Sequence, residues 1–261
     1  MRWEPDVGRG EWLRARIDQV WGDPWTVHTM VPRGFDRYAR IFHRTRSAAE
    51  PRNVSPVPWH VVAESHGAAA HPLMSWEEIK VDHTGPVHQD PLPTADDFDP
   101  PWFGTLEEDQ LSAIAAHLIR HTTTPDQGVA AIWDGFGDLF VHDYGRSWTV
   151  TGGPAPDPIP GLGEEEFHGP RLRLPNREYV LFEAGAAEFL GRWVSLAPWS
   201  SSGTQSPSIL WPEDRAWVLV CDTDWTSTII GGPVELMAQL LTDPAVDGAI
   251  IPADSALTGL G

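Results

Sequence analysis

Hydrophobic positions repeat with the three- and four-residue spacing of an amphipathic helix in several parts of the chain. Helices are expected over residues 11–21, 75–80 and 105–121 and in the segment after Pro233. Thr105 and Glu108 fit a reciprocal capping box, which would satisfy free backbone amides at the start of that helix. Leu236, Leu240 and Leu241 share one side of the last helix, so we expect that side to be buried.

Runs of β-branched and aromatic residues between prolines, glycines and charged residues predict the strands. They lie at residues 25–30, 38–43, 129–133, 139–141, 178–182, 217–222, 225–230 and 249–251. The glycine-rich turn at 134–137 favours a hairpin between its flanking strands, and Thr223-Asp224 favours a second hairpin between the strands on either side of it. Because hairpins pair antiparallel, the fold class is predicted to be α+β, an antiparallel-rich mixed sheet with helices packed on it.

Proline-rich polar stretches without apolar periodicity separate these elements and are expected to form surface loops. They are residues 50–58, 83–101 and 152–170. The last is the best candidate for a mobile loop, where proteases would cut first. A chain of 261 residues suits one large domain or two small ones. We therefore predict a single globular domain over residues 1–261, with two tightly packed halves, 1–103 and 104–261, as the alternative.

The charge balance narrows the choice of partners. The chain has 37 Asp and Glu against 18 Lys and Arg residues, and its formal net charge is −19. Nucleic acids and anionic membranes would be repelled, because binding to phosphate groups needs a cationic surface. A basic protein would be attracted and would associate faster. Residues 1–52 carry net positive charge, so we expect this segment to pack on the acidic remainder of the chain.

Cysteine usage and hydropathy indicate the cellular compartment. The single cysteine, Cys221, excludes an intramolecular disulfide and lies in an apolar run, where a thiol is usually buried. The sequence shows neither an apolar run long enough to span a membrane nor a signal-peptide pattern after Met1. We therefore expect a cytoplasmic protein that does not span or anchor to a membrane.

Several short motifs are spread over most of the chain. The C-terminal motif runs from Ile209 to Trp217 and is followed by Asp222, Trp225, Gly231 and Gly232. The other motifs are residues 38–43, 121–126 and 174–179. Together these motifs resemble a tryptophan-rich actinobacterial protein family of unknown function. The resemblance implies a shared organisation, and it carries no catalytic or binding residue over to this chain.

The segment from Val218 to Thr226 is an apolar strand that ends in an Asp-x-Asp-x-Thr motif, which is similar to the nucleophile motif of haloacid dehalogenase-type phosphatases. That resemblance makes Asp222 a nucleophile and Asp224 an acid or base beside Mg²⁺. The pair also resembles the Asp-x-Asp metal site of nucleotide-sugar glycosyltransferases. The lysine or nucleotide-binding region that these families need is not found in its place, so a solvated hairpin turn is the competing interpretation.

Histidines supply the other candidate metal ligands. His117 and His121 are four residues apart on a predicted helix, a spacing that places two imidazoles on one face for zinc. In the alternative, the helix dipole favours a charged His121 and His117 is packed or solvated. A second, loop-rich group consists of His60, His66, His71, Asp82, His83, His88 and Asp90. His117 and His121 alone leave a site incomplete, and loop spacing does not show that the second group converges, so we predict no metal and no cofactor.

Tryptophan is abundant, with 14 residues, and its positions suggest two roles. Trp12, Trp21, Trp133 and Trp217 fall on the inward sides of expected elements and are expected in the core. Five others lie in proline- or glycine-rich segments, where a large ring either pins a loop or contacts a partner. These candidate binding residues are Trp59, Trp102, Trp148, Trp199 and Trp211.

Together these features favour a non-catalytic acidic protein that binds a basic protein, such as a toxin-neutralising or regulatory partner. The alternative is a hydrolase-like enzyme that uses an Asp or Glu, or a His–metal site, on a small non-anionic substrate. A scaffold component is the third interpretation. Binding that weakens steeply with salt would favour the first of these.

Overall fold

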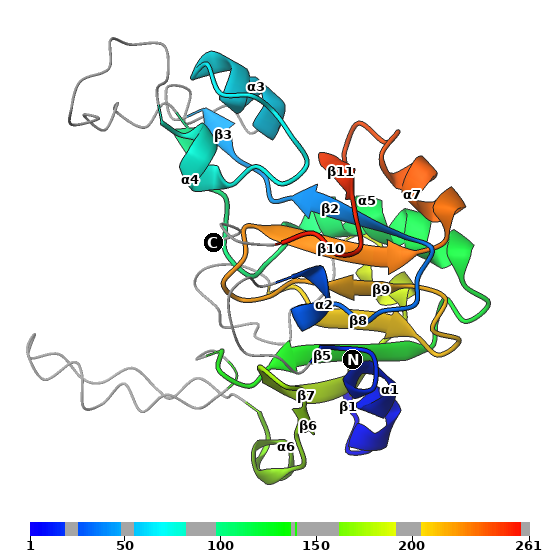
Figure 1. Cartoon of the computed structure of the whole chain (residues 1–261). Helices are drawn as coiled ribbons and strands as arrows, with labels where there is room; N and C mark the ends of the chain where they lie inside the picture. Colours follow the sequence, from blue (N-terminus) through cyan, green and yellow to red (C-terminus); the bar gives the residue numbers. More distant parts are fainter. Residues whose placement is uncertain are drawn as a thin grey trace, which may run out of the picture.

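The computed structural model describes residues 1–18, 26–47, 55–81, 98–136, 139, 162–191 and 205–256. Within these residues, a nine-stranded sheet forms the centre of the molecule (Figure 1). In spatial order its strands are β1 (Arg2–Trp3), β7 (Glu178–Glu183), β5 (Gly128–Trp133), β8 (Ile209–Pro212), β9 (Val218–Val220), β10 (Ser227–Gly232), β2 (Arg37–Phe42) and β11 (Gly248–Ile251). A further strand, β6 (Leu172–Arg173), also pairs with β7. All pairings between these strands are antiparallel, and with the helices described below they confirm the α+β fold class.

Side chains alternate between the two faces of this sheet, as the two-residue period of a strand requires. In β9, Val218 and Val220 face one hydrophobic cluster, and Leu219 between them faces the other. In β5, Val129 and Ala130 divide in the same way. Both faces of the sheet are therefore buried, which is why these strands have continuous apolar sequences.

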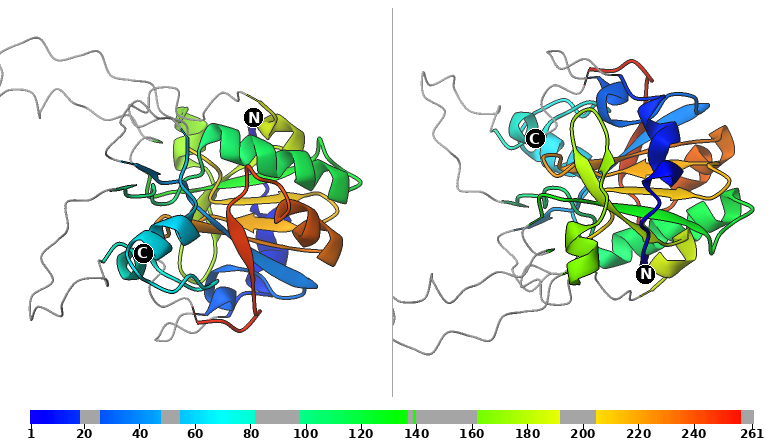
Figure 2. Two further views of the ribbon diagram at one scale, coloured as in Figure 1. Left: turned by 90° about the horizontal axis from the view of Figure 1, so that it is seen from above. Right: turned by 90° about the horizontal axis from the view of Figure 1, so that it is seen from below.

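Helices cover the two faces as separate layers (Figure 2). One face carries α5 (Glu108–Leu118), α7 (Val234–Leu240) and the 3-10 helix η5 (Ala186–Phe189), whose apolar residues share a cluster with β2, β9 and β10. The other face carries α1 (Glu11–Arg14) and α2 (Val27–Met30). The remaining helices are η1 (Val7–Gly10), η2 (Ile119–His121) and α6 (Glu164–His168). No helix in the described part of the chain combines the length and apolar character needed to cross a membrane.

A smaller unit packs beside one end of β2. It contains α3 (Trp59–Ser65), α4 (Trp76–Ile79) and a two-stranded sheet of β3 (Arg46–Ser47) and β4 (Phe98–Asp99). The ring of Trp59 stacks on Phe42 with ring centroids 4.8 Å apart, and its indole donates to the carbonyl of His43 at 2.8 Å. The buried guanidinium of Arg40 donates to the carbonyl of Met74 at 2.7 Å. These contacts join the unit to the central sheet.

The basic N-terminal segment packs on the acidic remainder, as its charge predicts. Arg2 forms an ion pair with Glu183, Arg9 with Glu213, Arg33 with Asp254, Arg44 with Asp109, and Arg46 with Glu107. In addition, β1 and β2 pair with β7 and β10, which come from the second of the two predicted halves. The division of the chain at residue 103 stays a prediction.

Several elements follow the predicted pattern closely. The hairpin of β9 and β10 places Ile229 opposite Val220, and β2, β7 and β11 lie where strands are expected. Helix α4 begins with a capping box in which the amide of Glu78 donates to Ser75 at 3.1 Å. Helix α7 buries Leu236 and Leu240, as its apolar spacing predicts.

Two predictions near the N-terminus are wrong. Residues 27–30 form α2 and not a strand, because the backbone amide of Thr26 donates to the Thr29 hydroxyl at 3.1 Å and caps a helical turn. The helix predicted over 11–21 is shorter, since α1 ends at Arg14 and turns follow. Residues 19–25, including Trp21, lie outside the described residues.

Three further predictions need correction or fall outside the described residues. Helix α5 begins at Glu108 with Glu107 as its N-cap, because the Thr105 hydroxyl accepts from the amide of Ser206 at 2.9 Å. The first predicted hairpin is wrong, since β7 and β8 occupy both edges of β5 and Leu139 lies in a 3-10 turn. Most of the predicted loops, including residues 83–97 and 152–161, are outside the described part. The end of the predicted 152–170 loop is instead helical, because α6 begins at Glu164 and the Gly163 amide donates to the Glu166 side chain at 2.8 Å.

Candidate binding site

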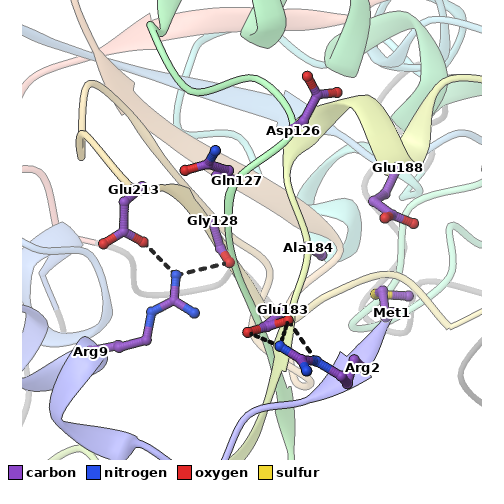
Figure 3. A pocket seen from close by; sticks show the side chains of 10 residues that line it. All are labelled: Met1, Arg2, Arg9, Asp126, Gln127, Gly128, Glu183, Ala184, Glu188 and Glu213. Atoms are coloured by element: carbon purple, nitrogen blue, oxygen red, sulfur yellow. Dashed lines mark hydrogen bonds and ion pairs between the residues drawn. The ribbon is translucent and has the colours of Figure 1, made fainter.

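A pocket opens at the end of the sheet where β5 begins and β7 ends (Figure 3). Its volume is about 610 Å³. The lining residues are Met1, Arg2, Arg9, Asp126, Gln127, Gly128, Glu183, Ala184, Glu188 and Glu213. They come from β1, η1, the turn before β5, the end of β7, η5 and the turn after β8. Four carboxylates and two guanidinium groups therefore meet in one cavity, although they are far apart in sequence. We call this cavity the acidic pocket.

The floor of the pocket is a rigid arrangement of backbone segments. A Cβ atom on Gly128 would lie 2.3 Å from the carbonyl oxygen of Trp211, and one on Gly185 would lie 2.3 Å from that of Pro125. The amide of Ala187 donates to the Pro125 carbonyl at 3.1 Å. Only glycine permits such close approach of backbones, so these two positions fix the spacing between the segment before β5 and η5.

Both arginines in the pocket are already paired. The guanidinium of Arg2 contacts both carboxylate oxygens of Glu183, at 2.8 and 2.7 Å. Arg9 donates to Glu4 at 2.7 Å and to the Gly128 carbonyl at 3.3 Å, and it also pairs with Glu213. Burial alone would raise the pKa of Glu4, but the hydrogen bonds from Arg9 and from the amide of Asp6 hold it below its ordinary value.

Two other carboxylates of the pocket are open. The side chains of Asp126 and Glu188 are exposed, and neither has a hydrogen bond or ion pair within the described residues. Figure 3 draws no contact between either of them and the two arginines. The described lining residues contain no histidine, cysteine, serine or threonine, and their exposed carboxylates are acceptors for a cation. The site is suited to bind a positively charged donor.

At the opposite end of the sheet, Asp222 and Asp224 meet an arginine. The guanidinium of Arg177 donates to both oxygens of Asp222, at 3.2 and 3.3 Å, and to Asp224 at 2.5 Å. The side chain of Asp222 is 2% exposed, and that of Arg177 is 17% exposed. Arg177 also lies 5.3 Å from the ring of Trp133. The hairpin turn is thus closed by an ion-pair network, and the Asp-x-Asp motif faces a fixed positive charge.

A second pocket of about 440 Å³ borders this network and is lined by Trp133, Asp134, Gly135, Leu174, Pro175, Asn176, Arg177 and Glu178. Its charged groups have partners: Asp134 pairs with Arg171 at 2.9 Å, and Glu178 pairs with Arg173 at 3.2 Å. In contrast to the acidic pocket, every carboxylate that lines this cavity is neutralised.

The two helical histidines do not converge with further ligands in the described residues. His117 contacts Asp243 through Nε2 at 2.8 Å and Arg120 through Nδ1 at 2.6 Å, so both ring nitrogens are occupied. The Nε2 atom of His121 is buried without a hydrogen-bond partner within the described residues. The described part of the chain contains no group of three or more His, Cys, Asp or Glu residues arranged to hold a metal ion.

The second histidine group is only partly described. His66 contacts the carbonyl of Ile79 through Nδ1 at 2.9 Å, His71 contacts Glu78 at 3.3 Å, and His60 is exposed. Asp82, His83, His88 and Asp90 lie outside the described residues. His66 and His71 therefore make separate local contacts, and these do not bring the three described histidines together.

The candidate binding tryptophans divide by exposure. Trp59 and Trp211 are buried, at 0% and 2% exposed. Trp59 packs α3 on Phe42 of β2, and Trp211 of β8 contacts the ring of Trp12 in α1. Trp102 is 46% exposed. Trp148 and Trp199 lie outside the described residues. Of the three that the structure describes, Trp102 is the one exposed to solvent.

Sequence reasoning missed a buried contact of Cys221. Its sulfur lies 3.7 Å from Nε2 of His43, which also contacts the Thr228 hydroxyl at 2.9 Å. Burial raises the pKa of Cys221 to about 12 and lowers the pKa of His43 to about 4. Both groups are neutral at physiological pH, so this contact lacks the thiolate that nucleophilic catalysis needs.

Comparison with protein-family models, with curated proteins and with solved structures finds no match for this chain.

Proposed function

We propose that this protein binds a basic protein partner and that the acidic pocket receives an arginine side chain of that partner. The observation that carries the proposal is the contrast inside the pocket, where Arg2 and Arg9 are paired while Asp126 and Glu188 are open. A guanidinium group carries five donors in a planar fork, which matches carboxylate acceptors in charge and geometry.

The charge of the whole chain supports the same partner. Its formal net charge of −19 attracts basic proteins at long range, while a neutral or acidic partner gains nothing from it. Many of its basic side chains form ion pairs within the chain, including those of Arg33, Arg44, Arg46 and Arg171. These arginines therefore do not present free positive charge to a partner. Long-range attraction and a local acceptor site therefore favour the same class of partner.

The rigid pocket floor supports binding through a preformed site. Gly128 and Gly185 fix the backbone, and the Arg2–Glu183 and Arg9–Glu213 pairs hold two walls. An acceptor site that needs little rearrangement loses less conformational entropy when a ligand binds.

The test is calorimetric titration with a defined probe, an acetylated and amidated glycine–arginine repeat peptide. Its matched control is the same peptide with citrulline, which has nearly the shape of arginine without the charge. The variant Asp126→Asn/Glu188→Gln should bind the arginine peptide roughly tenfold more weakly, because it replaces two charge-assisted hydrogen bonds by neutral ones.

The control variant is Asp36→Asn/Glu235→Gln, which makes the same change of net charge at exposed positions outside the pocket. It should bind like the wild type, and binding of either should fade near about 0.5 M salt. Equal weakening in the two double variants would show that only net charge matters and would refute the pocket. Equal binding of the citrulline peptide would refute the requirement for a cation.

A further inference from the structure

Two neighbouring aromatic side chains, Trp102 and Phe103, are exposed to solvent. Their exposed fractions are 46% and 53%. Six other tryptophans are buried to at least nine-tenths of their surface: Trp12, Trp59, Trp76, Trp211, Trp217 and Trp225. Two adjacent exposed rings form an apolar patch of the kind that often contacts a partner.

The backbone that carries these rings is held on both sides. Nδ1 of the buried His43 contacts the Trp102 carbonyl at 2.6 Å, and the amide of Gly104 donates to the Trp225 carbonyl at 2.9 Å. Gly104 has φ +63°, and a Cβ atom there would lie 2.6 Å from Cα of Thr223. The rings are therefore presented on a fixed support, which lowers the entropic cost of using them as anchors.

An open carboxylate precedes the aromatic pair. Asp99 is exposed, and its side chain has no hydrogen bond or ion pair within the described residues. Asp99 contributes to raising the pKa of Arg46, but this arginine is already paired with Glu107 at 2.6 Å. Two residues, Pro100 and Pro101, separate Asp99 from Trp102, so their Cα atoms are at most about 11 Å apart. One arginine side chain can reach both the carboxylate and the indole ring.

The net charge favours a basic protein over a second copy of this chain as the partner at this surface. A second copy of this chain would also carry −19 and would be repelled, whereas an arginine-bearing surface would be attracted. A guanidinium stacks on an indole face through cation–π attraction and donates to a carboxylate at its edge. Phe103 would cover the aliphatic part of the same side chain.

We propose that Asp99, Trp102 and Phe103 form a second arginine-docking surface, separate from the acidic pocket. The inference rests on the proposed function, because it assigns the same kind of basic partner a second contact. The two sites differ in chemistry. On this surface an aromatic face and one carboxylate would bind the cation, whereas in the acidic pocket the open groups are carboxylates alone.

The test uses the ¹⁵N-labelled full chain and follows the indole N–H resonances during titration with the glycine–arginine repeat peptide. The variant Trp102→Phe loses one resonance and so identifies that of Trp102. This resonance should shift with the arginine peptide and stay in place with the citrulline peptide. Trp102→Ala should weaken binding roughly fivefold, and Phe167→Ala, which removes another exposed ring, should leave the affinity unchanged.

The outcomes separate the two proposals. If the arginine peptide binds in a manner that depends on Asp126 and Glu188, but the Trp102 resonance does not move and Trp102→Ala binds normally, the aromatic surface is wrong and the pocket stands. If the peptide does not bind at all, both fail. Unchanged positions of the other indole resonances in Trp102→Ala establish that this variant is folded.

Discussion

Two pairs of carboxylates lie at opposite ends of the sheet and have different surroundings. Asp222 and Asp224 share Arg177, and the side chain of Asp222 is buried. Asp126 and Glu188 are exposed and have no ion-pair partner among the described residues. The difference shows that the position of an arginine, more than the acidic motif itself, decides whether a carboxylate stabilises the fold or is free to bind a ligand.

The largest effect is expected from removing the arginine of the buried pair. Arg177→Met should lower the free energy of unfolding by roughly 3 kcal/mol, because it leaves Asp222 buried and uncompensated. Urea unfolding followed by circular dichroism measures this loss. The control Arg173→Met breaks the exposed pair with Glu178, whose side chains are 73% and 48% exposed, and should change stability far less. Equal losses in the two variants would contradict the structural role of Arg177.

A smaller, pH-dependent effect is expected at the wall of the acidic pocket. Because its contacts hold the pKa of Glu4 below the ordinary value of 4.5, the ionised Glu4 stabilises the folded chain above that pH. This contribution is lost as the pH falls through the lowered pKa. Glu4→Gln should therefore be less stable than the wild type at pH 7, and the difference should shrink below about pH 4.5. Unfolding free energies measured between pH 7 and pH 3 check this, and a constant difference would contradict it.

The smallest effect on stability is expected from the open carboxylates. Asp126→Asn/Glu188→Gln removes charges that have no ion-pair partner within the described chain, so its unfolding midpoint should stay close to that of the wild type. The same variant should lose affinity for the arginine peptide. A large loss of stability would show that Asp126 and Glu188 stabilise the fold, as Asp222 and Asp224 do. It would contradict the difference that we infer between the two ends of the sheet.

Much of the fold is predictable from local pattern, because alternating and helical spacings express which faces are buried. This holds for β2, β7, the β9–β10 hairpin and α7. Residues 27–30 were predicted incorrectly because a threonine cap outweighed their strand-like composition. The start of α5 was misplaced because Thr105 bonds to Ser206, a hundred residues away in sequence. Local spacing does not contain such distant partners.

The candidate site was less predictable than the fold. The Asp-x-Asp motif is conspicuous in the sequence. Both of its carboxylates nevertheless form ion pairs with Arg177, which lies in a different hairpin. Asp126 and Glu188 belong to no motif, and they reach one cavity only because β5 and β7 are neighbours in the sheet. Trp102 belonged to the predicted binding set, but its exposure depends on the tertiary contacts of His43 and Gly104.

The most direct test of the central claim observes the side-chain carboxyl carbons of the ¹³C-labelled chain by NMR while the glycine–arginine peptide is added. The account predicts that the signals of Asp126 and Glu188 shift and saturate together, while those of Asp36 and Glu235 remain in place. Small, uniform shifts of all exposed carboxylates would show a general charge effect and would contradict a specific acidic pocket.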